Sequence, residues 1–96
     1  MVGEFVGTIS GGTVYRFKIT KNKAVSFTYG VQTTPINALK VSGELSSNSL
    51  TCEFGQLFGG GDGATAVLTY NPDLDQLSVQ FSGDLSTNVI CNRVAA

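Results

Sequence analysis

The fold can be read from residues 77–91, which have the sequence LSVQFSGDLSTNVIC. Leu77, Val79 and Phe81 alternate with polar residues, so an extended chain places them on one face and the polar residues on the other. Residues 86–88 (STN) are typical of a turn, and Val89 begins a second apolar stretch. The stretch therefore predicts an antiparallel hairpin with one buried face and one exposed face.

The same alternation recurs along the chain, at residues 15–19 (YRFKI) and 25–29 (VSFTY). No segment of about ten residues carries a sustained helical period. Short turns rich in Gly, Asn, Ser or Pro separate the alternating stretches. We therefore expect an all-β protein of about eight strands. The expected strands are residues 4–10, 13–20, 23–30, 38–45, 49–54, 64–71, 75–83 and 88–94.

Nearly all connections between these strands are short, so strands that follow one another should pair antiparallel as a meander. The longer loops are expected at residues 31–36 and 55–63. Strands of this number close into a small up-and-down β-barrel or fold over as a β-sandwich. We favour the barrel because closure removes exposed strand edges, and we keep the sandwich as the alternative.

An internal repeat is the strongest pattern in the sequence. Residues 41–52 (VSGELSSNSLTC) resemble residues 81–91 (FSGDLSTNVIC), and residues 6–15 (VGTISGGTVY) form a weaker copy. A three-strand unit that occurs twice and is followed by a final hairpin would produce this spacing. The repeat has two interpretations, which are a pair of equivalent binding sites and a duplicated hairpin without functional meaning.

The repeat carries a glycine late in each strand, at Gly7, Gly43 and Gly83. Glycine weakens the interior of a strand, so these positions predict a bulge, a sharp bend or a close approach of two backbones. Bends at matching places suit a small, tightly curled barrel. We therefore assign the three glycines a structural role.

Charge is distributed unevenly along the chain. The net charge of −1 argues against a dedicated nucleic-acid binder. Residues 1–40 hold five cations and one anion, whereas residues 41–96 hold one cation and six anions, so the halves carry +4 and −5. Complementary halves favour head-to-tail self-association, so we expect a homo-oligomer. The simpler alternative is that each half solvates its own surface.

The sequence contains no histidine, which removes the Ser-His-Asp and Cys-His catalytic arrangements and most zinc sites. Glu44 and Asp84 occupy matching positions of the repeat on the outward, polar side, where solvation explains them better than catalysis. Cys52 and Cys91 also match, but their strands lie far apart in a barrel, and a sandwich is the arrangement that could bring them together. Because the sequence shows no signal peptide, two reduced thiols are favoured over a disulfide. We expect no enzyme, no cofactor and no metal site.

Two places are candidates for a ligand site or an interface. The first is the glycine-rich loop with Phe58, Gly60 and Asp62. A strand rather than a helix follows this loop, which argues against a phosphate-binding loop of the nucleotide-binding type. The second is the basic strand face with Arg16 and Lys18, where no exposed aromatic residues are interleaved, so we expect no nucleic-acid binding there.

The 96 residues are expected to form one domain, residues 1–96. The chain has no apolar run of the ~20 residues that a membrane-crossing helix needs, and residues 1–5 do not resemble a signal peptide. A cytoplasmic location without a membrane partner is therefore the default expectation. The leading functional prediction is a non-enzymatic binding or structural module that assembles with itself. The alternative is a β-barrel that binds a small molecule or a carbohydrate, at its mouth or at the repeated hairpins.

Overall fold

The computed structural model describes residues 1–57 and 61–94, in which every regular element except one short 3-10 helix (η1) is a β-strand. Nine antiparallel strands form one sheet in the order β4-β3-β2-β1-β9-β8-β7-β6-β5. The elements are β1 (Gly3–Thr8), β2 (Val14–Ile19), β3 (Val25–Tyr29), β4 (Ile36–Asn37), β5 (Lys40–Glu44), η1 (Leu45–Ser47), β6 (Ser49–Phe54), β7 (Ala64–Asn71), β8 (Gln76–Gly83) and β9 (Thr87–Arg93). Apart from β4 and β5, consecutive strands pair with each other, which confirms the all-β meander.

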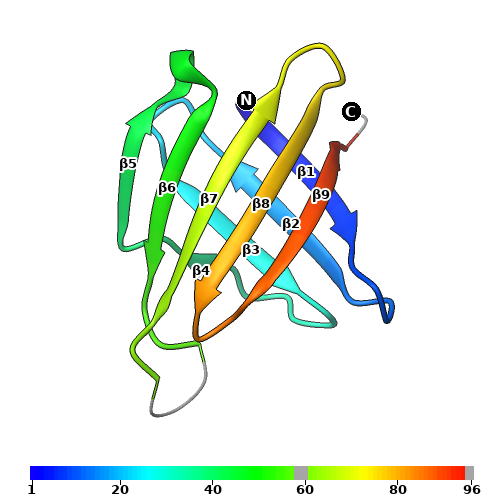
Figure 1. Cartoon of the computed structure of the whole chain (residues 1–96), viewed down its shortest axis with the longest axis vertical. Coiled ribbons are helices and arrows are strands. Elements are labelled where there is room, and N and C mark those ends of the chain that lie inside the picture. Colours follow the sequence, from blue (N-terminus) through cyan, green and yellow to red (C-terminus); the bar gives the residue numbers. More distant parts are fainter. Residues whose placement is uncertain (58–60, 95–96) are drawn as a thin grey trace.

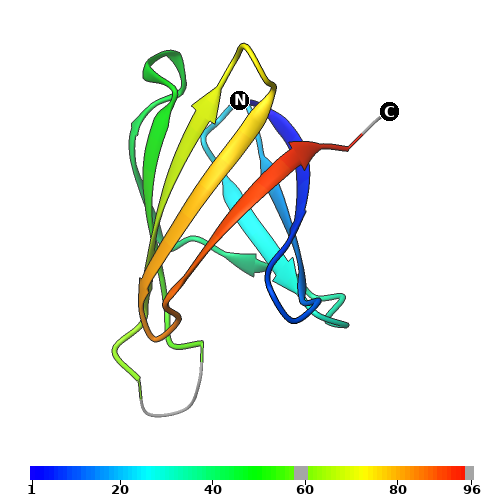
Figure 2. The same ribbon diagram turned by 45° about the vertical axis from the view of Figure 1, so that its right-hand side comes forward.

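The first and last strands of the chain, β1 and β9, pair in the middle of the sheet, and β4 and β5 form its two edges. At the opposite side, the Ala38 N–H donates to the carbonyl oxygen of Val25 at 2.9 Å, and the Leu39 N–H donates to that of Glu53 at 2.7 Å. Two consecutive residues thus link the β3 side of the sheet to the β6 side. Figures 1 and 2 show the resulting barrel-like shape, which agrees with the favoured barrel rather than with two stacked sheets.

The sequence alternation places one side of each strand inside the curl. In β2 and β8, buried apolar residues alternate with more exposed ones. The ring centroid of Phe27 lies 4.9 Å from that of Phe54 and 5.2 Å from that of Phe81, so aromatic rings pack at the centre. Among the described residues, no polar or charged side chain is buried. The buried apolar residues are Phe5, Tyr15, Phe17, Ile19, Val25, Phe27, Leu50, Cys52, Phe54, Ala64, Ala66, Leu68, Leu77, Val79, Phe81, Val89 and Cys91.

The predicted strands agree with eight of the nine observed ones to within two residues at each end. The exception is β4, which pairs with β3. Its first residue, Ile36, is the last residue of the predicted loop, and Asn37 lies between that loop and the predicted strand. Ile36 is partly buried against the core, which gives this short pairing an apolar contact. A strand of two residues has no period, so its alternation cannot be recognised in the sequence.

The three repeat glycines occupy two kinds of position. Gly43 and Gly83 have φ angles of +105° and +89°, in the region that favours glycine. A Cβ atom at either one would lie 2.5 Å or 2.6 Å from a carbonyl oxygen of the adjacent segment, so two backbones approach closely at each bend. Gly7 lies outside that φ region, but a Cβ there would overlap the carbonyl oxygen of Ile90. The absence of a side chain at Gly7 therefore lets β1 approach β9 closely. The internal repeat of the sequence stays a prediction.

Candidate functional site

The outer face of β1, β2 and β3 carries a groove of about 180 Å³ that contains both members of the predicted basic face. Arg16 and Lys18 project outward from β2, because the residues that alternate with them are buried in the core. Ser26 and Thr28 line the groove from β3. The lining residues are Glu4, Phe5, Arg16, Phe17, Lys18, Ser26, Phe27, Thr28, Pro35 and Val94.

The strand register gives the two cations different neighbours. Lys18 lies opposite Glu4 of β1, whereas Arg16 lies opposite Val6. On the β3 side, both cations lie opposite a residue with a hydroxyl group. A carboxylate therefore balances part of the charge on Lys18, while the cross-strand partners of Arg16 leave its charge unbalanced. Arg16 is the better anchor for an external anion.

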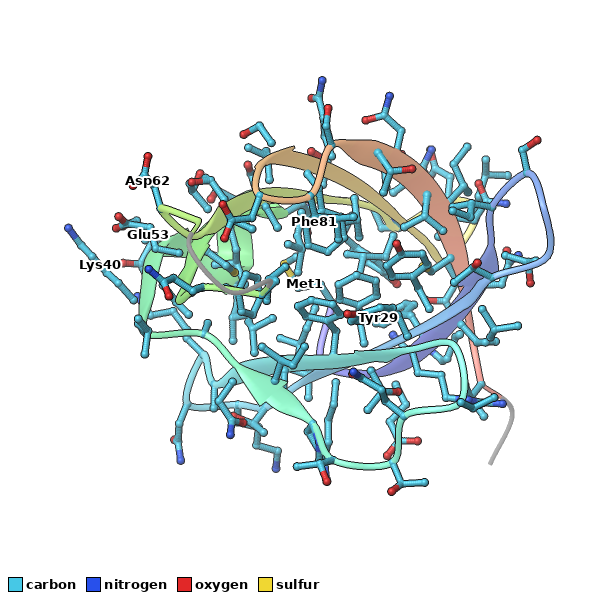
Figure 3. The ribbon with its side chains drawn as sticks, turned by 90° about the horizontal axis from the view of Figure 1, so that it is seen from below. Met1, Tyr29, Lys40, Glu53, Asp62 and Phe81 are labelled. Carbon is cyan, nitrogen blue, oxygen red and sulfur yellow. The ribbon has the colours of Figure 1, made fainter. Side chains whose placement is uncertain are left out.

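Most of the other cations already have a partner. The ion pairs of the described residues are Lys23–Glu44 at 3.8 Å, Lys40–Glu53 at 3.8 Å and Arg93–Asp75 at 2.8 Å. Figure 3 shows Lys40 and Glu53 next to each other on the outer surface. The first two pairs join the basic half of the chain to the acidic half, so the +4 and −5 halves partly neutralise each other within one molecule. Arg16 and Lys18 belong to none of these pairs.

The glycine-rich loop between β6 and β7 is organised by an internal carboxylate. Asp84 accepts backbone N–H groups from Leu57 at 3.3 Å, from Asp62 at 3.0 Å and from Gly63 at 3.0 Å. A Cβ atom at Gly61 would overlap the same carboxylate, so a larger residue there would have to displace the side chain of Asp84. The prediction that Asp84 serves surface solvation is therefore wrong, because N–H groups of the loop converge on it.

The predicted loop site is described only at Asp62, because Phe58 and Gly60 lie outside the described residues. The side chain of Asp62 is on the outer surface, as Figure 3 shows, while its backbone N–H is directed at Asp84. Asp62 is not among the residues that line the basic groove. The structure therefore brings Arg16 and Lys18 together and keeps them separate from the loop.

Burial removes both thiols from nucleophilic chemistry near neutral pH. Cys52 on β6 and Cys91 on β9 are free and buried in the core, as expected for two reduced thiols. Burial raises the pKa of each thiol to about 12. Because the thiolate is the reactive form, neither residue is a suitable nucleophile.

The mouth predicted for a small-molecule site corresponds to a cavity of about 550 Å³ at one end of the curl. It lies between residues 31–36, with Tyr29, and the segment of Gln56 and Leu57. Figure 3 views the molecule from this end and shows Tyr29 and Phe81 inside the curl. The chemistry of this lining does not distinguish a bound molecule from solvent, so a ligand site at the mouth stays a prediction.

A cluster around Arg93 was not indicated by the sequence. The Arg93 Nε–H donates to the carboxylate of Asp75 at 2.8 Å, and an Nη1–H donates to the carbonyl oxygen of Val2 at 2.7 Å. The guanidinium also lies 4.8 Å from the ring centroid of Phe5. Hydrogen bonds from Arg93 and then from Tyr70 lower the pKa of Asp75. The cluster ties the β7–β8 turn to β9 and to the start of β1.

No protein-family model, no curated protein and no solved structure matches this chain in the three comparisons. Among residues 1–57 and 61–94, no three side chains of the metal-binding types gather closely enough to hold an ion. The same residues contain no helix with the length and apolar character needed to cross a membrane. The basic groove is the arrangement that unites two predicted site residues in one cavity, and we take it as the candidate site.

Proposed function

We propose that this protein is a non-enzymatic binding module that holds an anionic group in the basic groove of β1–β3. The observation that carries the proposal is that Arg16 and Lys18 line one groove while the ion pairs of the described residues leave both cations out. A carboxylate or phosphate group could accept hydrogen bonds from the Arg16 guanidinium and from the hydroxyl groups of Ser26 and Thr28.

The size of the groove limits what it holds. A space of about 180 Å³ accepts one small oxyanion together with a few attached atoms, which is less than a typical drug-sized ligand fills. Glu4 repels an anion at the Lys18 end, so the anionic group should lie closer to Arg16. The absence of histidine in the sequence and the raised pKa of both thiols support binding rather than catalysis.

The proposal is tested by titrating the ¹⁵N-labelled protein with inorganic phosphate and, separately, with acetate at low ionic strength. We expect the amide resonances of residues 16, 18, 26 and 28 to shift with either anion, which would identify the shared oxyanion chemistry. Arg16→Gln should weaken the binding about tenfold or more, because it removes a charged hydrogen-bond donor. The two titrations also show whether a phosphate or a carboxylate is preferred.

Lys21→Gln is the matched control, because it removes one positive charge at the β2–β3 turn without altering the groove. It should leave the binding within about twofold of the unmodified protein. Equal weakening by Lys21→Gln and Arg16→Gln would reduce the effect to general charge attraction and would overturn the proposal. Absence of any amide shift in the groove with both anions would do the same.

Self-association is a second candidate function. Outside the ion pairs of the described residues, the cations Arg16, Lys18 and Lys21 remain in residues 1–40 together with Glu4. The carboxylates Asp62, Asp73 and Asp84 remain in residues 41–96. The solution mass from light scattering at low and high salt tests this candidate. An oligomer that dissociates as salt increases would support it. A monomer of about 10 kDa under both conditions would reject it.

A further inference from the structure

The outer face of β7, β8 and β9 carries a second hollow, of about 480 Å³, with a chemistry unlike that of the basic groove. Each of the three strands contributes two outward side chains to it. These side chains are Val67, Thr69, Ser78, Gln80, Asn88 and Ile90. Figure 1 shows the three strands side by side at the front of the molecule.

The register arranges these side chains in two rows across the sheet. Thr69, Ser78 and Ile90 lie opposite one another in the first row. The second row is formed in the same way by residues 67, 80 and 88. Because continuous antiparallel pairing holds all three strands, the hollow is built on rigid elements rather than on loops.

None of the residues that line the hollow carries a formal charge. The other outward positions of β7–β9 up to residue 92, which are Thr65, Asn71, Gln76, Ser82 and Asn92, are uncharged as well. Hydroxyl and amide groups both donate and accept hydrogen bonds, as the hydroxyl groups of a sugar also do. Val67 and Ile90, which are 37% and 59% exposed, supply apolar contacts for the C–H groups of a sugar ring.

The polar groups of the hollow are available to a ligand. Within the described residues, the side chains of Thr69, Ser78, Gln80 and Asn88 take part in none of the side-chain hydrogen bonds. Outside the hollow, by contrast, Gln76 donates to Asn92 at 3.1 Å, so these two side chains satisfy each other.

We propose that the hollow on β7–β9 binds an uncharged oligosaccharide through these free hydroxyl and amide groups. A second copy of this chain fits the hollow less well. The cores of protein interfaces are enriched in aromatic residues, Met and Arg and depleted in Ser, whereas this hollow contains Ser78 and none of the enriched types. The absence of aromatic rings for stacking also means that the affinity for the sugar is modest.

The test is a titration of the ¹⁵N-labelled protein with four uncharged hexasaccharides, which are cellohexaose, maltohexaose, xylohexaose and laminarihexaose. We expect at least one of them to shift the amide resonances of residues 67–69, 78–80 and 88–90. Gln80→Ala and Asn88→Ala should each weaken that binding about three- to tenfold, because each variant removes a hydrogen-bonding side chain. Both changes affect exposed side chains, and the amide spectrum checks that each variant folds.

Gln76→Ala is the matched control, because it truncates an amide on the same face whose partner is Asn92 rather than a ligand. Binding that weakens equally in this control, or that is unchanged in Gln80→Ala and Asn88→Ala, would overturn the proposal. It would also be overturned if none of the four sugars shifts these resonances. Shifts that depend on protein concentration without sugar would instead assign the face to a second copy of the chain.

Discussion

The two outer faces of the sheet are built alike but differ in chemistry. Each presents every second residue of three antiparallel strands above an apolar core. The β1–β3 face contains Glu4, Arg16 and Lys18, whereas the β7–β9 face is uncharged as far as Asn92. The alternating pattern thus constrains the inward residues of both faces, because these residues form the core. The outward residues are then free to match whatever each face contacts.

We expect the strongest effect at the two buried thiols, of which Cys91 lies behind the uncharged face. Cys52 on β6 and Cys91 on β9 have pKa values of about 12, against an ordinary value of 9.0. At pH 8 the thiolate fraction should therefore be about a thousandfold lower in the folded protein than in the unfolded chain. Because both side chains are also inaccessible to the reagent, the rate of alkylation should fall by at least this factor. Alkylation by iodoacetamide with and without urea, followed by mass spectrometry, measures this ratio.

A Val25→Cys variant places a matched thiol behind the charged face, since Val25 is a buried residue of β3. Equal protection of all three thiols would mean that the two faces open together as one cooperative unit. Much faster labelling at residue 25 would contradict this and would show that the β1–β3 side opens separately.

The next effect concerns the junction of the two faces, where β1 pairs with β9. Gly7→Ala should lower the free energy of unfolding by about 2–3 kcal/mol, because the added Cβ overlaps the carbonyl oxygen of Ile90. Urea denaturation followed by circular dichroism measures the loss. Gly55→Ala is the control, since a Cβ there would meet only the side chain of Leu39 at 3.5 Å. A loss below about 1 kcal/mol in Gly7→Ala would contradict the tight approach of β1 to β9.

A smaller effect is expected at Asp84, which follows β8 of the uncharged face and accepts hydrogen bonds from the β6–β7 loop. Asp84→Ala should lower the free energy of unfolding by about 2 kcal/mol, because three backbone N–H groups lose a charged acceptor. Glu44→Ala changes the matching position of the sequence repeat, where the ion pair with Lys23 is exposed, and should cost less than about 0.5 kcal/mol. Equal losses in the two variants would mean that the loop does not depend on Asp84.

The smallest effect is a pH dependence of the stability that arises from Asp75, in the turn between β7 and β8. The pKa of Asp75 is lowered by hydrogen bonds from Arg93 and Tyr70, so its ionised form favours the folded state. This contribution is complete above the ordinary pKa of 3.8 and is lost as the pH falls through the lowered pKa. The urea midpoint of the unmodified protein should therefore approach that of Asp75→Asn as the pH falls from about 4.5 through the lowered pKa. A constant difference over this range would exclude Asp75 as the titrating group.

Much of the fold follows from the sequence because one physical signal, the alternation of apolar and polar residues, recurs in almost every strand. Residues 77–81 show it most clearly, and the same signal places Phe17 and Phe27 in the core. The signal fails at β4, where two residues are too few to alternate. It also gives no information about how far the sheet curls, since that depends on contacts such as the one between Gly7 and Ile90.

The candidate sites were harder to predict from the sequence than the fold was. Arg16 and Lys18 could be identified because they alternate with core residues on a single strand. The partners of Asp84 could not, because they are backbone N–H groups that are 21 to 27 residues away, and their positions depend on the path of the loop. The hollow on β7–β9 combines side chains of three strands, so its shape emerges only when the register is known.

The carboxylate of Asp84 belongs to the same chain as the N–H groups that it binds, so it acts as a tethered ligand of the loop. A tethered group competes at an effective concentration in the millimolar range or above, and it cannot diffuse away. A free phosphate ion that reaches these N–H groups must therefore displace a resident competitor. The N–H groups of Leu57, Asp62 and Gly63 are thus already bound by a carboxylate of the same chain. An external anion at Arg16 has no such competitor.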